Sequence, residues 1–119
     1  MANLILEISF EFSLNILVYC EKLGERRKYI VQQQLLKSAT SIGANVREAQ
    51  SSESKSDFVH KLKIAAKESE ETHYWLCLCT KSPYYPNPPK ELFMQLQSIQ
   101  KVLSKIISTV KAKIKIERK

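Results

Sequence analysis

Glu70 and His73 have the residue types and the spacing of a helical metal site. On a helix, Glu-x-x-His places a carboxylate and an imidazole one turn apart, as in di-iron bundles. Such a centre requires two of these motifs and two further carboxylates. His60, the other of the two histidines, has no glutamate three residues before it. We therefore expect His73 to be a structural or surface residue, and the sequence predicts neither a metal nor a cofactor.

The cysteines and serines offer no better catalytic arrangement. Cys77 and Cys79 lie two residues apart, so on a helix their side chains diverge by about 200° and cannot hold one ion together. A Cys–His or Ser–His pair needs an orienting third group and an oxyanion site, and the sequence has no motif for either. We predict that the protein is not an enzyme. The enzymatic alternative would need a metal at Glu70 and His73.

These residues belong to the third of four predicted helices. From residue 58 to residue 79, apolar and small side chains recur in steps of four and three, which is the spacing of a helix with one buried stripe. Ser54 can cap the start of this helix through its hydroxyl oxygen, and Asp57 complements the positive helix end. Pro83 fixes the end of the helix, because proline cannot continue it.

Two more helices follow the same spacing, and the opening segment gives conflicting signals. One helix is predicted from about Tyr29 to Gln50, and the last follows Pro89 with a stripe from Leu92 to Val110. Residues 8–16 alternate between apolar and polar, as in a strand. A lone strand among three helices would have no partner for its backbone hydrogen bonds. The opening segment also carries a helical stripe, made of Ile5, Ile8, Phe12, Ile16, Tyr19 and Leu23, so we predict a helix here.

The predicted fold is all-α, an antiparallel up-down-up-down four-helix bundle with left-handed crossings near 20°. We expect a single domain over residues 1–119, with a basic C-terminal extension over residues 111–119. Asn45 lies beside the stripe of the second helix, so its amide should be partly buried and need partners. Ser69 and Thr72 are the predicted partners, in a structural polar layer that fixes the register between helices.

Residues 4–23 carry more apolar side chains than one buried stripe requires, namely 13 of 20. A second copy of the chain would cover the excess, so we predict a homo-oligomer. The alternative is that this helix is simply the most buried of the four.

The charge balance points to a polyanionic partner such as nucleic acid, or to a basic tail that only aids solubility. Nineteen Lys and Arg against twelve Asp and Glu give +7, and residues 111–119 contribute +4 of it. With only two glycines, phosphate-cradling loops and Rossmann fingerprints are excluded. Three cysteines without a disulfide spacing fit a reducing compartment. With no signal peptide and no bilayer-length apolar run, we expect a cytoplasmic protein and no membrane partner.

The sequence QLLKSATSIGANVREA, residues 34–49, resembles the signature of the 23S rRNA-intervening-sequence protein family. The match continues in order and spacing through residues 56–58, 61–62, 64–68, 70–72 and 74–76. Many relatives read Asn-Ile-Ala-Glu-Gly where this chain has NVREA, and one branch has the Arg-Glu-Ala version. Asn45 and Glu48 map onto the most distinctive positions of the family. Because Glu48 shares this status with Asn45, we add Glu48 to the predicted polar layer.

The resemblance implies a bacterial up-down four-helix bundle assembled as a ring of five copies. A related bundle is the accessory protein of diversity-generating retroelements and binds reverse transcriptase and RNA, so RNA or a protein of that kind is a partner by analogy only.

Two hypotheses follow. In the first, a non-enzymatic oligomer contacts RNA phosphates with weak sequence specificity. The residues predicted to make these contacts are Lys101, Lys105, Lys111, Lys113, Lys115, Arg118 and Lys119. In the second, the protein is an interaction scaffold or accessory subunit for another protein, and its tail serves solubility.

Overall fold

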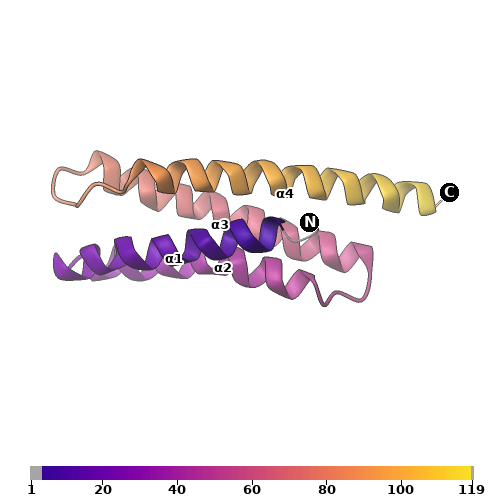
Figure 1. The fold of residues 1–119 in the computed structure, drawn as a ribbon, viewed down its shortest axis with the longest axis horizontal. Coiled ribbons are helices and arrows are strands. Elements are labelled where there is room, and N and C mark those ends of the chain that lie inside the picture. Colours follow the sequence, from indigo (N-terminus) through magenta and orange to yellow (C-terminus); the bar gives the residue numbers. More distant parts are fainter. Residues whose placement is uncertain (1–3, 119) are drawn as a thin grey trace.

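Four helices make up the computed structural model, which describes residues 4–118 (Figure 1). They are α1 (Leu4–Glu25), α2 (Tyr29–Ala49), α3 (Lys55–Lys81) and α4 (Lys90–Glu117). Residues 4–118 contain no strand, so the all-α prediction is confirmed. The helical pattern therefore outweighed the strand-like alternation in α1.

The helix ends follow the local sequence signals. The hydroxyl of Ser54 accepts a hydrogen bond from the backbone N–H of Asp57 at 3.0 Å, which is the predicted cap of α3. Pro89 directly precedes α4, and Ser82 and Pro83 directly follow α3. Between α1 and α2, Arg27 takes the left-handed conformation with φ of 60°, so the chain reverses in three residues.

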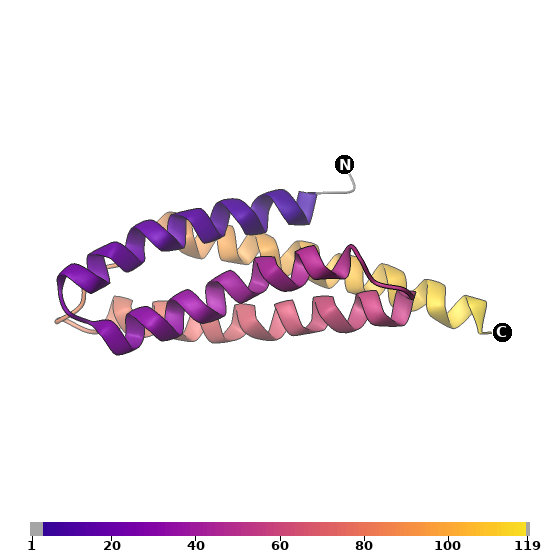
Figure 2. The same ribbon diagram turned by 90° about the horizontal axis from the view of Figure 1, so that it is seen from below.

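Cross-helix contacts fix the direction of each helix. Between α2 and α3 they join Ser38 to Thr72 and Glu48 to Lys61, so one residue number rises as the other falls. The same inverse order relates α1 to α2, α3 to α4, and α1 to α4. Every neighbouring pair therefore runs antiparallel, as Figures 1 and 2 show. The left-handed crossing stays a prediction.

The core runs along the axis between the four helices. In cross-section, α1 and α3 lie on opposite corners, and each packs against α2 and α4. The predicted stripes supply the core, because their members on all four helices are almost completely buried. The largest fully buried side chains include Phe12, Ile16, Tyr19, Leu35, Ile42, Leu62, Leu76, Leu96, Ile99 and Leu103.

The helices differ in length, and α4 extends past one end of the bundle. α4 has 28 residues and α1 has 22, which correspond to about 42 Å and 33 Å at 1.5 Å per residue. The rod measures 56 × 24 × 22 Å, and Figure 2 shows the last turns of α4 beyond the connection of α2 to α3. The predicted extension is thus a continuation of α4 as far as Glu117, and Lys119 lies outside the described residues.

Candidate nucleic-acid interface

The predicted basic residues of α4 fall on two sides of the helix. At 100° per residue, Lys101, Lys105, Lys111 and Lys115 lie within an arc of about 120°, and Lys113 lies about 120° from Lys101 on another side. All five lysines and Arg118 are exposed. The arc faces away from the core, because the buried stripe of Leu92, Leu96, Ile99 and Leu103 lies on the other side of α4.

A shallow depression lies along the middle of this arc. It has a volume of about 510 Å³ and is lined by Gln97, Gln100, Lys101, Ser104, Lys105 and Ser108. Its lining holds amides, hydroxyls and ammonium groups and no carboxylate. Such a surface can donate hydrogen bonds to an anion at several points.

α3 brings two more lysines to the same side of the bundle, and sequence reasoning missed them. Lys63 and Lys67 are exposed and lie one turn apart, after Val59 and before Glu70. Val59 borders the last turns of α4, and a Glu70 carboxylate oxygen lies 3.3 Å from the Gln100 amide nitrogen. At 100° per residue, Lys63 lies within about 40° of Val59 and Glu70, on the side of α3 that adjoins α4, and Lys67 lies about 40° further round, toward solvent.

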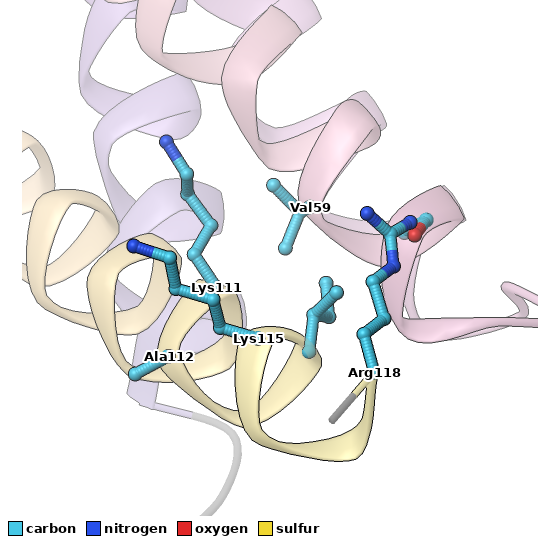
Figure 3. A pocket seen from close by; sticks show the side chains of 7 residues that line it. Val59, Lys111, Ala112, Lys115 and Arg118 are labelled. Carbon is cyan, nitrogen blue, oxygen red and sulfur yellow. The ribbon is translucent and has the colours of Figure 1, made fainter.

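A cleft of about 520 Å³ separates the first turns of α3 from the last turns of α4 (Figure 3). Val59, Ala112 and Ile114 give it an apolar lining, and Lys111, Lys115 and Arg118 surround it with positive charge. In Figure 3, Lys111 and Lys115 extend together on one side of Val59, and Arg118 lies on the other. The cleft thus joins the positive charge of the α4 end to that of α3.

The surface formed by these groups is called the α3–α4 basic face below. Its residues are Lys63, Lys67, Lys101, Lys105, Lys111, Lys115 and Arg118. Within residues 4–118 there are two ion pairs, Lys55–Glu117 at 2.6 Å and Lys61–Glu48 at 3.0 Å, and neither uses a cation of this face. The first pair occupies the carboxylate of Glu117, the one acid in residues 111–118. The face therefore keeps its positive charge available to an external anion.

Of the four residues predicted for the polar layer, Ser69 and Thr72 bond across helices, to partners other than Asn45. The Thr72 hydroxyl donates to Ser38 Oγ at 2.9 Å, and the Ser69 hydroxyl accepts from the Gln100 amide at 3.2 Å. The layer therefore links α2 to α3 and α3 to α4.

Asn45 and Glu48 bond elsewhere, which corrects the predicted membership of the layer. The Asn45 amide donates to the Ser41 carbonyl oxygen at 2.9 Å, one turn earlier in its own helix. The Glu48 carboxylate is exposed and pairs with Lys61. The Ser41 carbonyl and hydroxyl oxygens, one turn earlier, satisfy the Asn45 amide without a contact with α3.

Glu70 and His73 are not gathered with further ligands. The His73 ring packs edge-on against Phe93, with centroids 5.9 Å apart, and lies 3.7 Å from the Cys77 sulfur. No group of three or more His, Cys, Asp or Glu side chains with metal-binding geometry occurs in the part of the chain that the structure describes.

The buried thiols are poor nucleophiles in the folded protein. Burial raises the pKa of Cys20 to about 11, and it also raises the pKa of Cys79. Both thiols are almost fully buried, next to Tyr19, whose hydroxyl donates to the Pro86 carbonyl oxygen at 2.6 Å. Burial raises the pKa of this phenol as well. These groups are packing elements under ordinary conditions.

None of the helices described in residues 4–118 combines the length and the hydropathy needed to cross a bilayer.

Comparison with known proteins places the chain in a family. The family model described as "23S rRNA-intervening sequence protein" matches residues 2–106, which is most of the chain. The chain belongs to this family. The resemblance of residues 34–49 to the signature of 23S rRNA-intervening sequence proteins is thereby confirmed.

A solved structure that is similar to this chain in sequence has the same fold. It comes from Bacteroides thetaiotaomicron VPI-5482 and is described as a protein with unknown function from the S23 ribosomal protein family. The two chains are 37% identical with a TM-score of 0.82, over 87% of this chain and 98% of that one. No curated protein matches significantly. The family match ends at residue 106, so five cations of the arc and tail lie beyond it, namely Lys111, Lys113, Lys115, Arg118 and Lys119.

Proposed function

We propose that this 23S rRNA-intervening sequence protein is a non-catalytic RNA-binding protein that contacts phosphates through the α3–α4 basic face. The observation that carries the proposal is the gathering of seven exposed cations from two helices on one side of the rod. The Glu70 carboxylate, which accepts from the Gln100 amide at 3.3 Å, borders the depression at its middle but does not line it. Lys113 and Lys119 add charge near the same end of the chain.

The chemistry of the face favours binding to the phosphate backbone over reading of bases. Lysine is a flexible point charge, so it attracts phosphate oxygens without fixing one base identity. Each neutralised phosphate releases counterions, which makes the affinity depend on salt. The expected binding is therefore electrostatic and weakly sequence-specific.

The proposal is tested by titrating a fluorescently labelled RNA with three proteins. They are the wild type, a chain ending at Val110, and a variant with Lys63, Lys67, Lys101 and Lys105 all changed to Gln. The truncation removes +4 of the +7 net charge. Both altered proteins should bind RNA at least ten-fold more weakly at low salt, because each has lost several phosphate contacts.

A matched control removes the same number of positive charges from another part of the bundle. Lys37 and Arg47 are exposed cations of α2, away from the α3–α4 basic face. Changing Lys37 and Arg47 to Gln should weaken binding much less than changing Lys101 and Lys105. Equal losses from the two pairs would assign binding to net charge alone and would reject the α3–α4 basic face as the site.

We also propose that the protein forms a homo-oligomer through α1. The outward side of α1 exposes Phe10, Leu14, Leu17 and Val18, which are called the α1 outer face below, with 42–62% of each side chain accessible. Four large apolar side chains together are a surface that a monomer rarely leaves uncovered. The family resemblance predicts five copies. Repetition of the basic face in one particle would strengthen RNA binding by avidity.

In the second candidate function, the α1 outer face binds a different protein in place of another copy of the chain. The basic residues then serve solubility. Purification with and without nuclease separates the two. RNA that copurifies with the oligomer and is removed by nuclease supports RNA binding, whereas a protein retained in stoichiometric amount after nuclease supports the scaffold.

A further inference from the structure

Two connections that are far apart in the sequence meet at one end of the bundle, the end opposite the C-terminus of α4 (Figures 1 and 2). One is the α1–α2 turn at residues 26–28, and the other is the α3–α4 connection at residues 82–89. An Arg26 guanidinium nitrogen donates to the Tyr84 carbonyl oxygen at 3.1 Å. The Lys28 ammonium lies 4.9 Å from the centre of the Tyr85 ring. The fold thus joins the two connections into one surface.

This surface presents aromatic rings to solvent. Tyr84 is 72% exposed and Tyr29 is 53% exposed. Pro83 and Pro86 stiffen the backbone on both sides of Tyr84, and the Pro86 carbonyl oxygen is held by Tyr19 at 2.6 Å. A ring on such a fixed backbone loses little further freedom when a flat ligand stacks on it.

The same surface is strongly basic. Residues 22–28 carry four cations and one acid, a net +3, and residues 82–89 contain no acid. Arg26 and Arg27 are exposed. Arg27 has a φ of 60°, a conformation that glycine adopts more readily than arginine, so this position is not optimised for backbone stability.

We infer that Arg26, Arg27, Tyr29 and Tyr84, called the end platform below, bind unpaired nucleotides of single-stranded RNA. Exposed tyrosine rings stack on bases of any type, and the guanidinium groups neutralise the adjoining phosphates. Bases in a duplex are already stacked on one another and cannot reach the rings. The inference rests on the proposed RNA binding and adds the form of RNA that the protein selects.

The end platform and the α3–α4 basic face are connected by α4. Lys90 begins α4 beside the end platform, and Lys101 lies eleven residues further along the same helix, or about 16 Å at 1.5 Å per residue. An RNA strand whose bases stack at the platform can therefore continue along the lysines of α4. This arrangement predicts that unpaired nucleotides joined to a longer RNA bind better than either part alone.

The test compares a labelled single-stranded oligouridine with a blunt duplex of equal length by fluorescence anisotropy. The double variant Tyr29→Ala, Tyr84→Ala should bind the single strand about five-fold or more weakly, because each stacked base is lost. Its affinity for the duplex should stay within two-fold of wild type. Tyr74→Ala is the matched control, because Tyr74 is 57% exposed on α3 and lies outside the end platform. It should leave both affinities unchanged.

Arg27→Gly is a second test variant, chosen because the substitution should not destabilise the fold. Glycine fits the left-handed conformation at residue 27, so the melting temperature should not fall, whereas the affinity for the single strand should. Unchanged single-strand binding by the double tyrosine variant, or equal losses for single strand and duplex, would overturn the end platform. If only the Lys101→Gln and Lys105→Gln variants weakened binding, the α3–α4 basic face would remain the RNA site and the end platform would be rejected. If no variant weakened either RNA, the proposed function itself would fail.

Discussion

The α1 outer face gives the most direct prediction about assembly, namely that two charges placed in it will dissociate the oligomer. Leu14 and Leu17 are 42% and 47% exposed, one turn apart at the centre of the face. Full burial of one such side chain is worth about 1.5–3 kcal/mol, so burial of the exposed half contributes about 1 kcal/mol. The double variant Leu14→Glu, Leu17→Glu therefore loses about 2 kcal/mol of association free energy per face, or about 30-fold in affinity. The cost of burying two carboxylates adds to this loss.

Light scattering over a dilution series measures the effect. The wild type should keep a constant oligomeric mass, and the double variant should approach 13.7 kDa, the mass of one chain, as it is diluted. Met94→Glu is the control, because Met94 is 66% exposed on α4 and carries the same kind of change on another helix. Circular dichroism should give both variants the helical spectrum of the wild type. A double variant that keeps the mass of the wild type at all concentrations would refute the assignment of the interface to α1.

Three further predictions concern the core and its chemistry. Phe12→Ala removes a ring that is 0% exposed at the centre of the bundle, and urea unfolding should detect a loss of about 3–5 kcal/mol; a loss below 1 kcal/mol would contradict the packing described. Cys20 has a folded-state pKa of about 11 against an ordinary 9.0, so above about pH 9 the unfolded chain releases this proton first. The free energy of unfolding should fall with rising pH by at most about 1.4 kcal/mol per unit from this group. The fall should be smaller in Cys20→Ala, and an identical pH profile in the two proteins would contradict the prediction. Elemental analysis of the purified protein should find no stoichiometric metal, and one metal per chain bound at Glu70 and His73 would revive the enzymatic alternative.

Much of the fold could be predicted because each helix carries its own signals. The stripe of Phe12, Ile16 and Tyr19 identified α1 as a helix despite the alternating pattern, and Ser54 marked the start of α3. The predicted stripe of α4 ends at Val110, and the sequence pattern does not say whether the charged residues after it continue the helix. In the structure, Ile114 continues the stripe and packs near Val59 of α3, so the helix persists to Glu117.

The functional surfaces depend on register between helices, which a single sequence does not contain. Lys63 and Lys67 join the lysines of α4 only because α3 and α4 pair with Ser69 opposite Gln100. The sequence also gave no sign that Arg26 would meet Tyr84, 58 residues away. The predicted partners of Asn45 are wrong for a local reason. Its amide bonds to the Ser41 carbonyl within its own helix, and not to Ser69 or Thr72 on α3.

The salt dependence of RNA binding tests the central claim most directly. The logarithm of the association constant, plotted against the logarithm of sodium chloride concentration from 50 to 400 mM, should fall with a slope of about −0.7 for each phosphate contact on a single strand. With at least four lysines engaged, the wild type should give a slope of about −3 or steeper. The variant with Lys63, Lys67, Lys101 and Lys105 changed to Gln should give a slope that is shallower by about 2 to 3 units. A wild-type slope near zero, or the same slope in both proteins, would contradict the account.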